Sequence, residues 1–275
     1  MFTTTDAIQA GTYALSPILD LPAPLPPRHP TGKGIFIWNI PQTEAGNVDQ
    51  IALKAVFSQF DWVGIKMHDR AAAWGNPIVN LNLAQALQGA GLSVWGWGYC
   101  YGDNPTGEAD VVLRELARLD LAGYFIDAEH EYKHKPAQAE AFIQRLGAGT
   151  DRPIGLCSYR YPTLHPEIPW AEFLEGCDFH LPQMYWVGDN RINAPGLQLA
   201  RSYEQLKARK DLPYIPLGIS CRDQNWQPSV AQLENFWAAC ALRDLPGAGY
   251  YQWEATVRLP ANWDEIASQS MWPRG

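Results

Sequence analysis

The chain has 275 residues, of which 47% are hydrophobic and 18% are charged, and its formal net charge is −8. This length suits a single α/β barrel of about 250 residues, and the composition is that of a packed globular protein rather than a disordered one. The acidic balance excludes the basic stripe that binding to nucleic acid or to an anionic membrane surface requires.

The first 33 residues differ in composition from the rest and predict an N-terminal extension. Residues 21–30, LPAPLPPRHP, are too rich in proline for a helix or a central strand. We therefore expect a strap that lies over the main domain, residues 34–275, or binds a protein partner. The chain has no basic segment before an apolar stretch near its start and no apolar run of about 18 residues. These absences predict a protein without a signal peptide or membrane insertion, made in the cytoplasm and released by lysis or carried on a virion.

From residue 34 onward, short β-rich runs alternate with segments of helical hydrophobic spacing. The predicted strands cover residues 34–40, 62–69, 92–100, 123–129, 153–159, 178–186, 214–221 and 247–255. The predicted helices cover residues 48–60, 81–90, 108–119, 137–146, 170–175, 197–207 and 230–242.

Strands that alternate with helices pair in parallel through right-handed crossovers. A doubly wound open sheet would share this pattern, but the first strand is not followed by a G-x-G-x-x-G phosphate loop. The count of eight strands favours a closed (β/α)₈ barrel. In that fold the functional side chains lie at the carboxyl ends of the strands.

The fourth predicted strand ends in the sequence IDAE and carries two acidic residues. Asp127 and Glu129 are two positions apart, so strand alternation points both side chains to the same face. Two carboxylates facing one cavity repel each other, which raises the pKa of one of them. A carboxylic acid that keeps its proton near neutral pH can protonate a glycosidic oxygen. A structural salt bridge at the barrel rim is the alternative role for this pair.

On other predicted strands, strand alternation points further polar and aromatic side chains to the same face. Gln183 and Tyr185 share one face of residues 178–186, opposite Met184 and Trp186. Residues 92–101 carry four aromatic side chains that strand alternation points to the same face: Trp95, Trp97, Tyr99 and Tyr101. We expect the earlier ones to fill the barrel and the later ones to stack on sugars. The last strand places two more polar residues in one phase, Gln252 and Glu254.

Lys66 and His68 are two positions apart in residues 62–69, so strand alternation predicts that they share one face. A histidine in this position suggests a metal site as an alternative. The candidate ligands are His68, Asp69, His130 and His180, but no H-x-H or H-E-x-x-H spacing is present. No G-x-S-x-G surrounds a serine. The five cysteines are scattered without a C-x-x-C pair and predict free thiols made in a reducing compartment. We therefore expect neither a metal nor any other cofactor.

With these residues in view, the chain resembles the glycoside hydrolase family 25 lysozymes between residues 34 and 255. IDAE is similar to the D-x-E of that family, GIKMHD to its I-I-K segment, RPIGLCSY to its fifth strand and YYQWEA to its last strand. The resemblance implies a barrel that cleaves peptidoglycan, with Glu129 as general acid/base and Asp127 as the assisting carboxylate. It also implies a substrate-binding cleft, to which we assign Asn39, Lys66, Tyr99, Gln183, Tyr185, Gln252 and Glu254.

Two features separate this chain from the families it resembles. Asn39 follows the first strand, where family 25 has an aspartate. The sequence QMYW is similar to the M-x-Y element of family 18 chitinases, but Ala122 and Phe125 replace the first two acids of their D-x-x-D-x-D-x-E pattern. The sequence therefore predicts a hydrolase of a β-linked N-acetylhexosamine polymer such as peptidoglycan or chitin. The alternative is a non-catalytic carbohydrate-binding or virion-associated module on the same fold, and a metal-dependent hydrolase is a third hypothesis.

Overall fold

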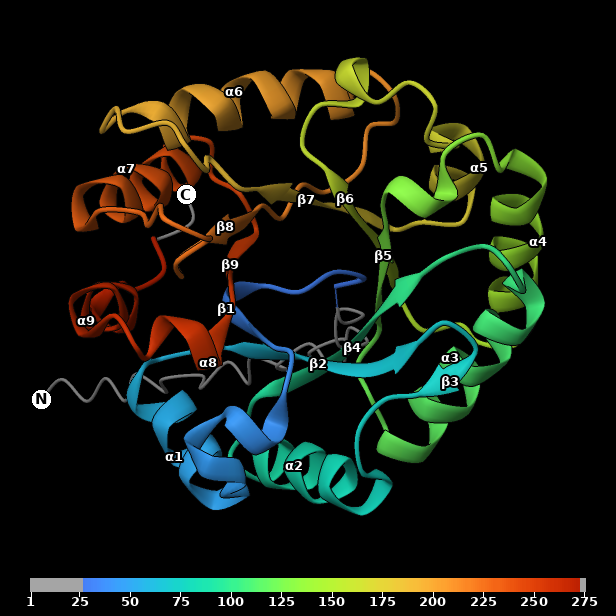
Figure 1. Cartoon of the computed structure of the whole chain (residues 1–275), viewed down its shortest axis with the longest axis horizontal. Helices are drawn as coiled ribbons and strands as arrows, with labels where there is room; N and C mark the ends of the chain where they lie inside the picture. The colour runs from blue at the N-terminus through green and yellow to red at the C-terminus, as the bar shows by residue number, and fades with distance from the viewer. Residues whose placement is uncertain (1–26, 273–275) are drawn as a thin grey trace, which may run out of the picture.

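The computed structural model describes residues 27–272 and contains a closed (β/α)₈ barrel (Figure 1). Residues 1–26, which make up most of the predicted extension, lie outside the described part. The ring closes because β1 pairs in parallel with both β2 and β9. Its strands are β1 (Gly32–Ile37), β2 (Trp62–Asp69), β4 (Ser93–Cys100), β5 (Tyr124–Ala128), β6 (Ile154–Tyr159), β7 (Phe179–Met184), β8 (Leu217–Ile219) and β9 (Gly247–Tyr251). The short β3 (Ala72–Ala73) pairs antiparallel with the end of β2. The predicted fold is confirmed.

Helices surround the strands on all sides in Figure 1. They are α1 (Val48–Phe57), α2 (Pro77–Gly89), α3 (Pro105–Leu119), α4 (Pro136–Gly147), α5 (Trp170–Glu175), α6 (Ala194–Lys207), α7 (Val230–Ala241), α8 (Trp253–Thr256) and α9 (Pro260–Ser268). Asn76 and Asn104 each cap a helix whose first residue is proline, because an asparagine side chain accepts from the free backbone N–H groups and proline has the helical φ already. None of the described helices is long and apolar enough to cross a membrane.

The interior of the barrel is filled by aromatic side chains. Phe125 stacks on Trp95 at 5.1 Å and on Phe36 at 5.3 Å between ring centroids. Trp62 fits only because its neighbours are small: a Cβ atom on Gly34 would lie 1.9 Å from the Trp62 ring. The expectation that Trp95 fills the barrel is confirmed. This aromatic layer closes the barrel, so any cavity at the carboxyl ends of the strands has a solid floor.

Several predicted strand boundaries differ from those of the structure. β1 begins at Gly32, two residues before the expected start. β8 is limited to three residues, and Tyr214 makes only an isolated bridge with His180. The strand expected over residues 247–255 ends at Tyr251, because the chain turns into α8 at Trp253. The last difference matters for the site, since helical spacing replaces strand alternation there.

Lys33 connects the first strand of the barrel to the last helix. Its side chain is buried, and its Nζ donates to the backbone oxygens of Ile266 at 2.7 Å, Ala267 at 3.1 Å and Gln269 at 2.5 Å. Burial lowers the pKa of Lys33 to about 8. The three carbonyl oxygens accept the hydrogen bonds of the ammonium group, so no carboxylate is needed. The free carbonyl groups at the carboxyl end of a helix favour a cation in this position.

Candidate functional site

A cavity of about 400 Å³ lies at the carboxyl ends of the strands. Six barrel strands or the residues directly after them supply its walls, as the fold predicts. The lining residues are Trp38, Lys66, Asp69, Trp97, Tyr99, Tyr101, Asp127, Glu129, Glu131, Gln183, Tyr185 and Tyr251.

Asp127 and Glu129 both face this cavity. The Nε2 atom of Gln183, on β7, donates to Asp127 Oδ1 at 3.0 Å and to Glu129 Oε1 at 2.8 Å. A single amide therefore holds the two carboxyl groups together. Asp127 lies deeper, with 8% of its surface exposed, whereas Glu129 is half-buried and nearer the opening. Glu129 is the member of the pair that a bound molecule would reach first.

Burial raises the pKa of both carboxyl groups. The pKa of Asp127 lies well above its usual range because of burial and the negative charge of Glu129, although the Lys66 ammonium group opposes part of this rise. Burial also raises the pKa of Glu129, and the hydrogen bond from Gln183 lowers it again in part. Two close carboxylates in one site cannot both ionise easily. The pair therefore holds a proton to a higher pH than an exposed carboxyl group would.

Lys66 contributes a positive charge to the same cavity. Its Nζ lies 2.7 Å from Asp69 Oδ2 and 4.0 Å from the centre of the Trp74 ring. The predicted shared phase of Lys66 and His68 is wrong, because the pairing of β2 with β4 shifts register between them. Such a bulge reverses the side-chain alternation. His68 consequently points out of the barrel, and its ring bonds Tyr124 Oη at 2.6 Å.

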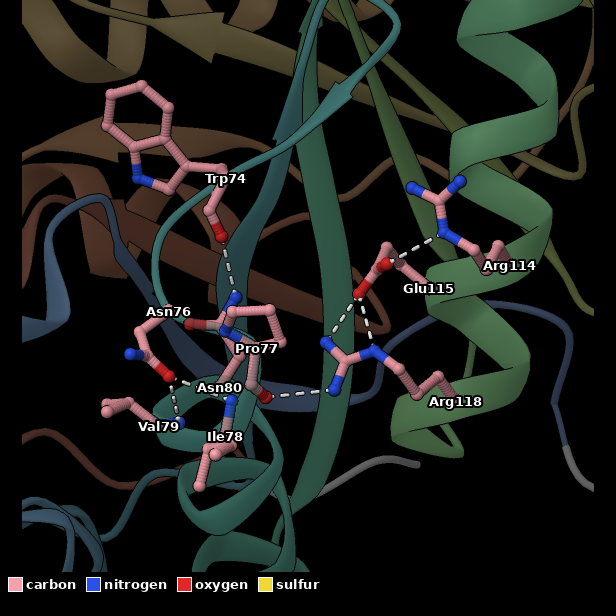
Figure 2. Close-up of polar contacts among 9 residues, drawn as sticks. All are labelled: Trp74, Asn76, Pro77, Ile78, Val79, Asn80, Arg114, Glu115 and Arg118. Atoms are coloured by element: carbon pink, nitrogen blue, oxygen red, sulfur yellow. Dashed lines mark hydrogen bonds and ion pairs between the residues drawn. The ribbon is translucent and has the colours of Figure 1, made fainter.

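The segment that carries Trp74 is held by hydrogen bonds at several points (Figure 2). Asn80 Nδ2 donates to the Trp74 oxygen at 2.7 Å, and Trp74 Nε1 donates to the Trp38 oxygen at 3.1 Å. In Figure 2 the side chain of Arg118 reaches from α3 to the carbonyl oxygen of Pro77, at 2.9 Å, while Glu115 holds the same guanidinium. These bonds fix the indole ring that packs against Lys66.

Tyr99 lies in the cavity as predicted, and it leads to a carboxylate that the sequence prediction omits. Tyr99 Oη donates to Glu131 Oε2 at 2.5 Å. Burial and this hydrogen bond raise the pKa of Tyr99, so the phenol stays protonated. Glu131 lies two positions beyond Glu129, and the D-x-E-x-E spacing was the signal that could have found it.

Gln183 and Tyr185 face the cavity, while Met184 and Trp186 pack in the outer core, so the predicted alternation is confirmed. The Tyr185 ring lies 5.6 Å from that of Tyr251. Tyr251 was missed because the strand was expected to continue and to present residues 252 and 254.

Three predicted substrate-binding residues lie outside this cavity. Glu254 is buried at the start of α8, where it accepts from the backbone N–H groups of Asn39 at 2.9 Å and Trp38 at 3.2 Å. Asn39 lines a separate cavity of about 210 Å³. The Oε1 atom of Gln252 is buried without a hydrogen-bond partner among the described residues. Glu254 therefore orients the end of β1, which carries the Trp38 ring into the main cavity.

A second cavity, of about 280 Å³, adjoins the first and shares three of its walls, Glu129, Gln183 and Tyr185. Its other walls follow β6: Tyr159, Arg160, Tyr161, Leu164 and His165. Glu129 thus stands where the two cavities meet, with space on both sides of its carboxyl group.

The candidate metal ligands do not come together. Within residues 27–272, no group of three or more His, Cys, Asp or Glu side chains is arranged to hold a metal ion. His68 and His180 each place a ring nitrogen on a backbone oxygen, that of Arg70 and that of Lys210. The five cysteines are buried free thiols.

No family model and no curated protein matches this sequence. The fold is similar to that of the class V chitinase from Pseudomonas fluorescens Pf-5, with a TM-score of 0.63 and 10% identity over 87% of this chain and 99% of that one. It is similar to the spore cortex-lytic enzyme SleL from Bacillus megaterium QM B1551, with a TM-score of 0.60 and 9% identity over 89% of this chain and 75% of that one.

The glycoside hydrolase domain of PgaB (BpsB) from Bordetella bronchiseptica has a TM-score of 0.60 and 13% identity, over 88% of this chain and 100% of that one. At such low identities the likeness concerns the fold: this chain has a barrel of the kind found in glycoside hydrolases. The resemblance to family 25 in particular stays a prediction, because one fold serves many substrates.

Proposed function

We propose that the chain is a glycoside hydrolase that cleaves a β-linked N-acetylhexosamine polymer of the peptidoglycan or chitin type. The observation that carries this proposal is the position of Glu129, which lies beside Asp127 at the junction of two adjoining cavities. A polymer that passes through both cavities has one of its glycosidic bonds over the Glu129 carboxyl group. The chitinase and the spore cortex-lytic enzyme that share the fold support this choice of polymer.

In the proposed reaction, Glu129 gives its proton to the glycosidic oxygen as the bond from that oxygen to the anomeric carbon breaks. The acetamido oxygen of the same sugar attacks the anomeric carbon, and this forms a cyclic intermediate. Water then opens the intermediate, and its proton returns to Glu129. This route suits a pair of carboxyl groups on one strand, since Asp127 shares a side of the cavity with Glu129 and is not opposite to it.

Asp127 and Tyr185 would orient the acetamido group. Asp127 has a raised pKa, so its carboxyl group can either accept a hydrogen bond from the acetamido N–H or carry a proton itself. Burial raises the pKa of Tyr185 well above its usual range, so its hydroxyl group is a neutral donor. Trp97 and Trp38 line the same cavity and offer flat apolar faces to the sugar rings.

The direct test is the variant Glu129→Gln, assayed on chitin oligosaccharides and on purified cell wall by mass analysis of the products. We expect the rate to fall by about 10²–10⁴-fold, because general acid catalysis is lost, while the melting temperature is not lower than that of the unmodified chain. Glu140→Gln, on the exposed face of α4, is the matched control and should keep full activity. Wild-type turnover by Glu129→Gln would refute the assignment.

One observation favours a second candidate, a non-catalytic carbohydrate-binding module. The residue after β1 is Asn39, whose Oδ1 is buried without a partner among the described residues, so β1 brings no carboxylate to the cavity. Calorimetry that detects glycan binding, together with no reducing ends released from any polymer of the panel, would establish this candidate.

The role of the proline-rich residues 21–30 as a strap or a partner-binding arm remains our proposal, to be tested by deleting them and measuring binding and activity.

A further inference from the structure

The second cavity has an unusual distribution of charge. The first cavity is lined by four acidic side chains and one lysine: Asp69, Asp127, Glu129, Glu131 and Lys66. The second cavity adds no acid to the Glu129 that it shares, and it contains Arg160. The acidic lining of the cleft therefore ends at Glu129, and the charged residue beyond it is Arg160.

Arg160 directly follows β6, and its guanidinium group has no polar partner. Among residues 27–272 it makes neither a hydrogen bond nor an ion pair, and its Nε is buried and unpaired. Its one contact with an aromatic ring is with Tyr161, at 5.0 Å from the ring centre. Most arginines in the described part of this chain do have a polar partner: Arg70, for example, pairs with Asp103. A guanidinium group that is partly buried and unpaired is costly unless something else supplies its acceptors.

A second arginine lies behind one wall of this cavity, against the Tyr161 ring. Arg201, on α6, lies 4.3 Å from the centre of the same Tyr161 ring and likewise makes no ion pair or hydrogen bond within the described part of the chain. His165 lies on the cavity wall, and its Nδ1 is buried without a partner. The histidine ring stacks on Tyr159 at 3.7 Å between centroids, which makes a flat surface beside Arg160.

We infer that the cavity beside Arg160 is a sugar-binding subsite for a residue that carries a carboxylate. The Tyr159–His165 stack would hold the face of the ring, and Arg160 would bind the carboxylate through two parallel N–H groups, the geometry that suits a guanidinium group. The inference rests on the proposed function, since it names the substrate class of the same cleft. A carboxylate of this kind occurs on a uronic acid or on the lactyl ether of a muramic acid that carries no stem peptide.

The test is a binding measurement in the Glu129→Gln variant, which keeps the glycans intact. The probes are hyaluronan oligosaccharides, for the uronate, and peptidoglycan glycan strands freed of their stem peptides, for the lactyl carboxylate. Each is measured beside the same material with its carboxyl groups reduced to alcohols, and chitin oligosaccharides serve as a neutral reference. We expect one of the two acidic glycans to bind at least about tenfold more tightly than its reduced form, since charge-assisted hydrogen bonds are the strong ones.

Adding Arg160→Gln should remove this preference and leave the binding of the reduced form unchanged. Arg160→Lys should restore part of it, because the charge returns without the two-pronged geometry. Arg209→Gln, at a guanidinium group that contacts Trp170 and lines another cavity, is the matched control and should keep the full preference.

Equal binding of acidic and reduced glycans would overturn the inference, as would a preference that survives Arg160→Gln or an absence of binding to every probe. The outcome is separable from that of the proposed function. If the wild-type chain cleaves acidic and neutral polymers equally, the hydrolase proposal stands and the Arg160 inference fails. If acidic glycans bind through Arg160 but no polymer is cleaved, the reverse holds.

Discussion

Asp127 shows how burial can make an acidic side chain work against the folded state. Its carboxyl group is almost fully buried beside Glu129, and its pKa lies well above 3.8, its usual value. A carboxyl group with a raised folded-state pKa stabilises the fold fully only below its unfolded pKa, and this contribution is lost as the pH rises towards the folded pKa. At neutral pH the Asp127–Glu129 pair therefore lowers the stability of the protein.

We predict that Asp127→Asn raises the melting temperature at pH 7. The amide has no charge to bury, and a gain of about 1 kcal/mol corresponds to roughly 2–4 °C for a domain of this size. The difference from the unmodified chain should shrink as the pH falls through the range above 3.8 and should vanish below 3.8, where Asp127 is protonated in both states. Calorimetry at several pH values checks this. A melting temperature that is unchanged or lower at pH 7 would show that the pair is not under charge strain.

Gln183 sets how the proton of this pair responds to pH. Its amide donates to both carboxyl groups, and its hydrogen bond lowers the pKa of Glu129. In Gln183→Met the pKa of Glu129 should rise, so the alkaline limb of the pH–rate profile should move to higher pH. We also expect kcat/KM to fall about tenfold or more, as for the loss of a hydrogen bond to a charged group. Gln144→Met, on α4, should change neither quantity.

At the scale of single elements, the bulge in β2 decides which side chains enter the site. The shift in register turns Asp69 into the cavity beside Lys66 and sends His68 outward, where it bonds Tyr124 and the oxygen of Arg70. Gly98 of β4 leaves the room for the imidazole ring, since a Cβ atom there would lie 2.1 Å from it. The bulge is therefore built jointly by β2, β4 and β5.

Burial lowers the pKa of His68 to about 4 from 6.5, so this ring is neutral in the folded protein at neutral pH. A depressed histidine pKa means that the unfolded chain binds more protons between these values, and stability falls as the pH drops from 6.5 to 4. We expect the loss due to His68 to be about 3 kcal/mol. In His68→Gln the free energy of unfolding, measured with urea at pH 7 and pH 4.5, should be lower at pH 7 but should decline less. An equal decline in both proteins would contradict this role.

The alternation of strands and helices is enough to predict the barrel, because each strand must be covered by a helix and each helix by the sheet. It is also enough for Asp127, Glu129, Gln183 and Tyr185, whose strands are regular. The failures occur where the backbone leaves the period of two. At the bulge, Asp69 faces the cavity and His68 does not. At the end of β9, Tyr251 lines the cavity in place of Gln252, because β9 passes directly into α8. No single-sequence pattern reports such a break, since it depends on pairing with a distant strand.

For the whole molecule, the cysteines give a simple measure of integrity. All five side chains are buried and unpaired: Cys100, Cys157, Cys177, Cys221 and Cys240. Burial raises the pKa of the Cys157 thiol well above its usual value, so little reactive thiolate forms. We predict that Ellman's reagent detects no reactive thiol per chain in the folded protein and five per chain after unfolding in guanidinium chloride. Fast reaction of any thiol under native conditions would indicate a local opening of the barrel.

The bonds that Lys33 makes to the end of α9 have a consequence for biosynthesis. Strand β1 leaves the ribosome long before its neighbour β9 and long before the carbonyl groups that accept from Lys33, which lie 233 to 236 residues further along the chain. Until then the nascent polypeptide has an open sheet edge and a lysine without acceptors. Such a protein completes its fold only after translation of α9, and in the meantime its unpaired edge is a target for chaperones.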